Sequence, residues 1–169
     1  MSHTEPVYSV QFSDIHLGEN SLNPNAAKGS FLSALDEVGG MAPTPAFVAV
    51  TGDLVCCGRR HELEQYADLA RASTIPLYAI PANHDQWGEE DDAAWRELVG
   101  PSRHVVDKGD LRLLLFQDIH RSPQGGWETS LLPETASWLR EKLSEWPRGK
   151  AMVGFHAPVL AEAGDWHGN

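Results

Sequence analysis

The sequence predicts a layered α/β fold that contains either one mixed sheet or two sheets. Short β-prone runs alternate with amphipathic helical segments in the first half of the chain, in the order βαβαβ. In the second half, two β-prone runs are separated by a loop of hairpin length. With 41% of its 169 residues apolar, the chain can bury one substantial core. We therefore expect one domain in which strands and helices form separate layers.

The first half of the chain is expected to form three strands joined by two helices. Residues 7–12 are β-rich, and apolar residues at helical spacing predict a helix over residues 25–40 that ends at paired glycines. Residues 46–51 are continuously apolar, which is typical of a strand buried on both faces. A second helix over residues 62–72 and a third strand over residues 76–80 complete this half.

The second half changes pattern. A short helix is expected around residues 95–99, followed by a hairpin of strands over 103–107 and 111–117. A further helix begins near Pro133, since proline is well placed at a first helical position. Residues 150–155 form the last predicted strand.

The composition restricts the classes of binding partner and the cellular compartment that we expect for this protein. The net charge of −11 leaves no basic footprint for nucleic acid, and no apolar run is long enough to span a membrane. No secretory leader pattern opens the chain, so we expect a cytoplasmic protein. Cys56 and Cys57 are adjacent, a spacing that rarely permits a stable disulfide, and both are expected to be reduced thiols.

Metal-capable side chains follow four of the predicted strands. Residues 14 and 16 follow the first strand, and in an extended segment residues i and i+2 point the same way. The carboxyl edges of strands in open α/β sheets are where ligands bind. The candidate ligands at these strand ends are Asp14, His16, Asp53, Asn83 and His156.

These residue types indicate a first-row metal. Carboxylates, imidazoles and an amide oxygen without thiolate suit Mn, Fe or Zn, and a carboxylate between two ions can bridge them. We expect two divalent or trivalent ions. Each motif alone is weak, because a strand-end histidine is often a structural residue and Asn-His-Asp at 83–85 is also a common turn. The ordered set on four strand ends is what favours a metal site.

Four segments resemble the sequence blocks of the calcineurin-like metallophosphoesterases. They are Phe-Ser-Asp-Ile-His-Leu-Gly at 12–18, Val-Thr-Gly-Asp-Leu-Val at 50–55, Ile-Pro-Ala-Asn-His-Asp at 80–85 and Phe-His-Ala-Pro at 155–158. The hairpin, the following Gly125 and Trp127, and the helix with Trp138-Leu139 are similar to the bacterial class III cyclic-nucleotide phosphodiesterase branch. The resemblance covers nearly the whole chain.

The resemblance implies an α-β-β-α sandwich of two mixed sheets flanked by helices, with two metals in the groove between them. On this pattern Asp14 and His16 hold the first metal, Asp53 bridges, and Asn83 and His156 hold the second. Two cations about 3.5–4 Å apart acidify a bridging water and brace the in-line displacement at phosphorus. The implied substrate is a small phosphoester, most similar to a cyclic nucleotide or another small phosphodiester.

The resemblance also implies that His84 is catalytic. An imidazole beside the second metal can protonate the departing alkoxide or steady the phosphoryl oxygens. Asp85, the next residue, is expected to orient the His84 ring.

The pattern departs from the family after His156. The fifth block, Gly-His-x-His, is absent, so we expect a single domain over residues 1–169 that is truncated and lacks its C-terminal strands. His120 and His167 are the nearest substitutes for the missing ligands, and the alternative is a catalytically impaired remnant or interaction module. Ala82 stands where the family usually has glycine, which predicts backbone strain if that position needs a positive φ.

Overall fold

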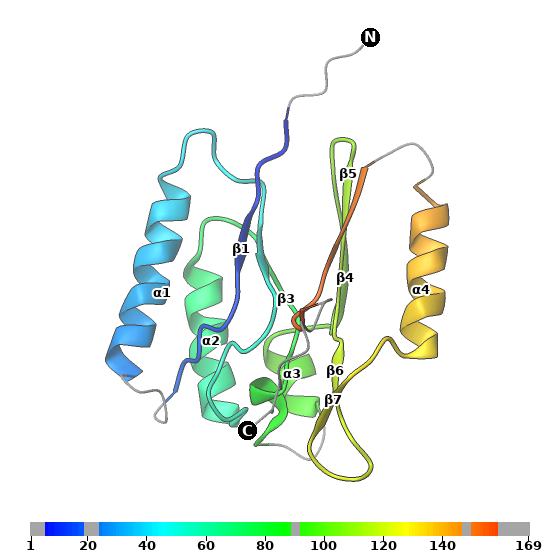
Figure 1. Cartoon of the computed structure of the whole chain (residues 1–169). Helices are drawn as coiled ribbons and strands as arrows, with labels where there is room; N and C mark the ends of the chain where they lie inside the picture. Colours follow the sequence, from blue (N-terminus) through cyan, green and yellow to red (C-terminus); the bar gives the residue numbers. More distant parts are fainter. Residues whose placement is uncertain (1–5, 19–23, 89–91, 147–149, 159–169) are drawn as a thin grey trace.

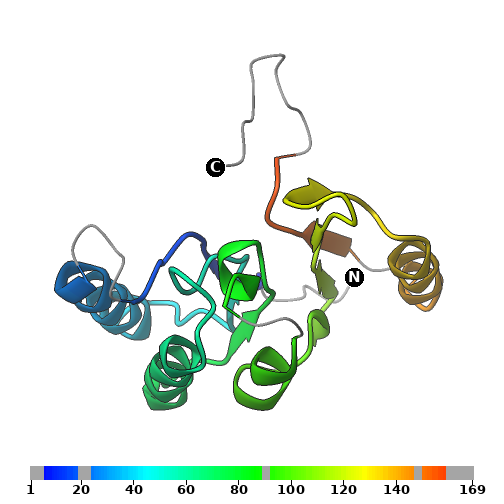
Figure 2. The same cartoon turned by 90° about the horizontal axis from the view of Figure 1, so that it is seen from below.

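Two three-stranded sheets face each other between outer helices, as Figure 1 shows. The computed structural model of the chain describes residues 6–18, 24–88, 92–146 and 150–158. Helices α1 and α2 cover the outer face of the first sheet, and α4 lies outside the second (Figures 1 and 2). The predicted layered α/β fold with two sheets flanked by helices is confirmed.

The first sheet is parallel throughout its described strands. Its order is β1 (Val10–Phe12), β2 (Val48–Val50) and β3 (Leu77–Ala79), with α1 (Pro24–Gly39) and α2 (Arg60–Ala72) as the crossover helices. Parallel strands need such crossovers, and the alternating pattern of the sequence predicts them. Because the three strands run in one direction, the loops that follow them meet at one edge of the sheet.

The second sheet is mixed. Strands β4 (Arg103–Lys108) and β5 (Leu111–Phe116) form the predicted antiparallel hairpin, with Val106 opposite Leu113. After α4 (Pro133–Ser144), strand β8 (Lys150–Gly154) joins the sheet parallel to β5. The parallel pairing brings the C-terminal end of β8 toward the edge where the loops of the first sheet meet.

Three short elements complete the fold, and two of them were not predicted. Helix α3 (Ala93–Leu98) matches the expected short helix. The small hairpin of β6 (Ile119–Arg121) and β7 (Trp127–Thr129) and the 3-10 helix η1 (His84–Gln86) were missed. Alternation of apolar and polar residues is recognisable only over about four to eight residues, and β6, β7 and η1 have three residues each. Strands β1 to β3 are equally short but lie inside longer β-prone runs, which is why the sequence predicts them.

Strand β2 is the centre of the core and is buried on both faces, as predicted. Val48 and Val50 pack in a cluster between the first sheet and the helices, whereas Ala49 belongs to a cluster between the two sheets. The second cluster also contains Phe47, Ile80, Val106, Leu113 and Leu115. The two sheets are therefore joined by apolar packing, and the polar strand ends lie at the margin of that contact.

Two further expectations concern the C-terminal strands and membrane-spanning helices. The expected loss of C-terminal strands concerns sequence after residue 158, outside the described residues. Within the described ranges, no helix has the length and apolar character needed to cross a lipid bilayer.

Candidate metal centre

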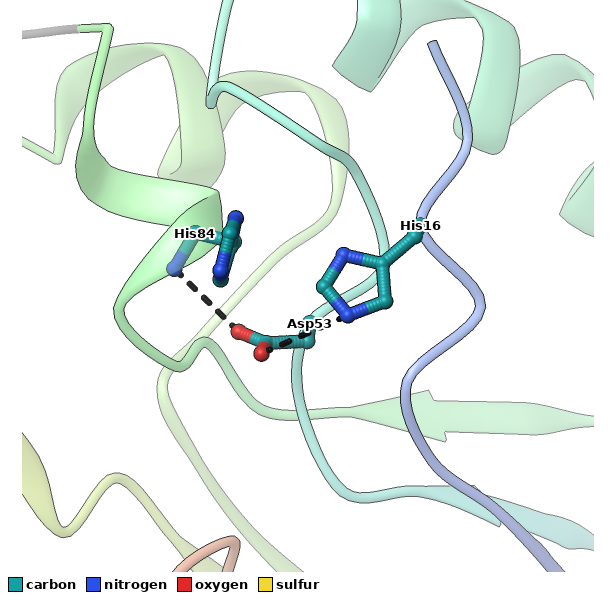
Figure 3. A group of neighbouring side chains, drawn as sticks. All are labelled: His16, Asp53 and His84. Carbon is teal, nitrogen blue, oxygen red and sulfur yellow. Dashed lines mark hydrogen bonds and ion pairs between the residues drawn. The ribbon is translucent and has the colours of Figure 1, made fainter. Parts of the chain in front are cut away.

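Side chains from four strand ends converge around the carboxylate of Asp53. Two groups of potential ligand atoms form there, each with all its atoms within 4.8 Å of one another: His16, Asp53 and His84 in one, and Asp14, Asp53 and His156 in the other. Figure 3 shows the first group, with the rings of His16 and His84 on either side of Asp53. Asp53 belongs to both groups, which is the arrangement that a bridging carboxylate requires.

The distances around Asp53 suit a first-row metal ion. Asp53 Oδ2 lies 3.7 Å from His16 Nε2 and 3.6 Å from His156 Nε2, and Asp14 Oδ1 lies 3.8 Å from His16 Nε2. Two ligand atoms that each bind an ion at about 2.1 Å are about 3.4 Å apart at a tetrahedral angle. The observed separations are a few tenths of an ångström larger, so small side-chain rotations would complete the coordination. The donor set of carboxylate and imidazole fits Mn, Fe or Zn.

Three of these residues have a left-handed backbone. Among the described residues, the non-glycine positions with positive φ are Asp14 (56°), His16 (49°) and Asp53 (53°). The expectation that Asp14 and His16 converge because their segment is extended is therefore corrected. A left-handed φ costs about 1 kcal/mol or more for such residues, and strain of this kind gathers at functional sites.

Backbone hydrogen bonds between the loops after β1 and β2 maintain this conformation. The Asp14 amide donates to the Gly52 carbonyl at 3.1 Å, and the His16 amide donates to the Asp53 carbonyl at 3.0 Å. The Leu17 amide donates to the Leu54 carbonyl at 2.9 Å and continues the ladder. The two loops are therefore one paired unit, and the candidate ligands on them keep a fixed relative position.

Backbone carbonyls orient two of the three imidazoles. His156 Nδ1 lies 2.7 Å from the Thr51 carbonyl, and His84 Nδ1 lies 2.8 Å from the Cys56 carbonyl. A carbonyl oxygen only accepts, so Nδ1 of each ring carries the hydrogen and donates it. Nε2 of each neutral ring therefore has a free lone pair, and Nε2 of His156 faces Asp53. Second partners of this kind orient metal-binding histidines.

His84 is a partly buried member of the first group of potential ligands. Its backbone amide donates to Asp53 Oδ1 at 3.2 Å, and its ring makes an edge contact with the ring of His16, with centroids 4.7 Å apart. The indole of Trp87, which is 41% exposed, covers another side of the His84 ring at a centroid distance of 4.0 Å. The His84 ring therefore lies beside Asp53 and His16 on one side and the partly exposed Trp87 on the other.

Asp85 does not orient His84, and this expectation is corrected. Both oxygens of its buried carboxylate accept from backbone amides: Oδ1 from Leu54 and Val55 at 2.8 and 3.1 Å, and Oδ2 from Asp53 and Ala82, both at 2.9 Å. The hydrogen-bond partner of the His84 ring is the Cys56 carbonyl, not the Asp85 carboxylate. Burial raises the pKa of Asp85, and the surrounding amide donors, which favour the ionised form, act against that rise. Asp85 is a structural link between the loops after β2 and β3.

Comparison of this sequence with known protein families shows the family to which the chain belongs. The sequence pattern of the calcineurin-like phosphoesterases matches residues 9–169. The chain belongs to this family. The resemblance in the four sequence blocks is thereby confirmed, while the closer resemblance to cyclic-nucleotide phosphodiesterases stays a prediction.

Two curated proteins are similar to this calcineurin-like phosphoesterase. One, from Arcobacter nitrofigilis, is named a probable glycerophosphodiester phosphodiesterase GpdQ and is 26% identical over 159 residues, which cover 89% of this chain and 57% of the relative. The other, the glycerophosphodiester phosphodiesterase GpdQ of Enterobacter lignolyticus, is 29% identical over 150 residues, covering 82% and 50%. The chain spans about half the length of the curated relatives it matches.

A solved structure is also similar. It is a protein of unknown function from Aquifex aeolicus, 16% identical, with a TM-score of 0.45 over 94% of this chain and 84% of that chain.

Four other residues singled out in the sequence of this phosphoesterase lie outside the two ligand groups or outside the described part of the chain. Asn83 is the residue before η1, beside His84, and its role as a ligand stays a prediction. His120 lies on β6 outside both ligand groups, and its buried Nε2 has no hydrogen-bond partner within the described residues. His167 lies outside the described residues. Ala82 is not among the described positions with positive φ, so the strain expected there is absent.

Gly52 has a role at the site that the sequence pattern did not predict. Its φ is 98°, and a Cβ at this position would lie 2.6 Å from Ala82 Cβ and 2.8 Å from His156 Nδ1. Only glycine therefore allows His156 to approach this close to the loop that carries Asp53. The glycine immediately before Asp53 is the sequence signal that could have revealed it.

The Asp85 link gives a first prediction. In Asp85→Asn, one acceptor oxygen is replaced by an NH₂ group that faces backbone donors. We expect the free energy of unfolding to fall by about 2–4 kcal/mol, measured by urea denaturation. The matched control is Asp68→Asn on the exposed side of α2, which should change stability by less than about 0.5 kcal/mol. A similar small change in Asp85→Asn would contradict the proposed link.

Gly52 gives a second prediction. Gly52→Ala should destabilise the chain by about 2 kcal/mol more than Gly125→Ala and should weaken Mn²⁺ binding, because the new methyl group displaces His156. Gly125 is the matched control, since its φ is 93° and a Cβ there would have no heavy atom within 4 Å. Chemical denaturation and Mn²⁺ titration measure the two effects. Equal losses in both variants would mean that backbone strain alone explains the result.

Proposed function

We propose that this chain is a metal-dependent phosphodiesterase that hydrolyses a small phosphodiester. The observation that carries the proposal is the position of Asp53 in two groups of candidate ligands. A shared carboxylate supports two ions of Mn, Fe or Zn, divalent or trivalent, with Asp14, His16, Asn83 and His156 completing their coordination. Membership in the calcineurin-like phosphoesterase family and two relatives named as phosphodiesterases support the same reaction.

The proposed substrate is a compact phosphodiester. The sequence resemblance implies a cyclic nucleotide or another small phosphodiester. The names of the relatives favour a glycerophosphodiester, which presents the same phosphodiester group. The net charge of −11 opposes binding to a nucleic acid backbone and therefore disfavours a nuclease.

The residues have distinct roles in this proposal. When bound, the two metal ions supply the positive charge that stabilises the phosphoryl oxygens and the attacking nucleophile. Asp53 fixes the distance between the two groups of ligands, and Nδ1–H donation to Thr51 directs the Nε2 lone pair of His156 toward Asp53.

His84 is the proposed general acid. Because Nδ1–H donates to the Cys56 carbonyl, Nε2 is the nitrogen that takes up a proton and delivers it to the departing alkoxide. Trp87 packs against the ring and limits its movement.

Metal dependence is the third prediction and tests the function. The purified chain should hydrolyse bis(p-nitrophenyl) phosphate in excess Mn²⁺ and lose this activity with a chelator. At a Mn²⁺ concentration of about 100 times the dissociation constant of each site, binding should stabilise the fold by about 2.7 kcal/mol per occupied site. Asp53→Asn should lower metal content at both positions, as measured by elemental analysis, whereas Asp68→Asn should leave it unchanged.

Two outcomes would redirect this proposal. Full metal occupancy in Asp53→Asn would remove the bridging role. Stoichiometric metal binding without turnover of any phosphodiester would favour the catalytically impaired module instead.

The role of His84 is the fourth prediction. His84→Ala should reduce turnover by about 10²–10⁴-fold while the metal stays bound, and the defect should be smaller for substrates with p-nitrophenolate as the leaving group. His61→Ala, an exposed histidine on α2, is the control and should retain full activity. Equal defects for good and poor leaving groups would contradict the acid role, and loss of metal from His84→Ala would make His84 a ligand.

A further inference from the structure

The segment that carries His156 is bound to a buried carboxylate outside both ligand groups. Asp118, between β5 and β6, is 4% exposed. Its Oδ1 accepts from the His156 amide and its Oδ2 from the Ala157 amide, both at 2.9 Å. Two consecutive amides on the two oxygens of one carboxylate fix the position of the peptide group between them and also its rotation.

Asp118 itself is held by neighbouring elements of the second half of the fold. Its carbonyl accepts from the Ser130 amide at 2.8 Å, just after β7. The preceding residue, Gln117, donates from its backbone to Ser102 at 3.0 Å and from its side chain to the Ile119 carbonyl at 2.9 Å. The carboxylate therefore has a fixed position before it contacts the His156 segment.

We propose that Asp118 is a positioning residue of the metal centre that acts through His156. The backbone of His156 is fixed by Asp118, and its ring is fixed by Thr51, so Nε2 faces Asp53 at 3.6 Å. Without Asp118, the ring retains the Thr51 contact and loses the anchor of its backbone. This inference rests on the proposed metal-dependent function, because it assigns Asp118 to the binding of metal by His156.

Glu62 provides a matched control for a purely structural carboxylate. It is 1% exposed, and its Oε2 accepts from the amides of Cys57 and Arg59 at 3.1 and 3.0 Å. It therefore resembles Asp118 in burial and in accepting two backbone hydrogen bonds. Its bonds stabilise the start of α2, however, and contact no part of the His156 segment.

A double-mutant cycle with Mn²⁺ alone as the probe tests the proposal. Binding to the 169-residue chain is measured from the electron paramagnetic resonance signal of free Mn²⁺. We expect Asp118→Asn to weaken Mn²⁺ binding by about 10- to 100-fold in the presence of His156. In the His156→Ala background the same substitution should change binding by less than about twofold, because the group through which it acts is gone. Glu62→Gln should lower the melting temperature without changing Mn²⁺ affinity.

The outcomes separate the inference from the function on which it rests. If the unaltered chain binds no Mn²⁺, or His156→Ala does not weaken binding, the proposed centre fails and the inference falls with it. If His156→Ala weakens binding but Asp118→Asn does not, or weakens it equally in both backgrounds, only the role of Asp118 is overturned.

A second variant covers a failure of Asp118→Asn to fold. Asp118→Ser retains an acceptor oxygen and places no NH₂ group against the amides, so it is measured in the same two backgrounds with the same expectation. Loss of folding in both substitutions would assign Asp118 to stability alone and overturn the proposal.

Discussion

The carboxylate of Asp85 accepts hydrogen bonds from four backbone amides that belong to two different strand-end loops. Three of these amides follow β2 and include that of Asp53, while the fourth belongs to Ala82 after β3. A buried carboxylate with fewer donors would carry a large desolvation penalty. The two loops therefore stabilise the Asp85 carboxylate, and the carboxylate in turn joins the two loops. The position of Asp53 relative to His84 depends on this contact, and both groups of candidate ligands depend on Asp53.

The backbone of the candidate metal centre is strained, and hydrogen bonds between the neighbouring loops offset the cost of that strain. Asp14, His16 and Asp53 all have positive φ, and the ladder between their loops maintains that conformation. Gly52 adds a close approach to His156 that a methyl group would prevent. Because the backbone already places the carboxylates and imidazoles together, binding of the proposed cations would need little reorganisation. Such preorganisation favours both affinity and geometric control at a metal site.

The sequence predicted the fold class, the main strands and helices, and the strand ends at which polar side chains gather, because hydrophobic periodicity and strand boundaries are local signals. It gave the wrong reason for the convergence of Asp14 and His16, whose backbone is left-handed rather than extended. It also assigned Asp85 to the His84 ring on the basis of adjacency alone. The actual partners of Asp85 and Asp118 lie about 30 to 40 residues away for most of their contacts, and a single sequence gives no sign of such pairings. The hairpin of β6 and β7 was missed because its strands are too short to show a pattern.

Burial alone does not distinguish the carboxylates that can bind metal from those that support the fold. Asp53, Asp85 and Asp118 are all 4% exposed or less. Both oxygens of Asp85 and of Asp118 accept from backbone amides, which uses their acceptor capacity on the chain itself. Asp53 accepts the His84 amide at Oδ1 and turns Oδ2 toward two imidazoles, which in their neutral form bind a cation beside it. The direction of the neighbouring amide groups, set by loops from three strands, is therefore what makes Asp53 the proposed bridge in a chain with 24 acidic residues.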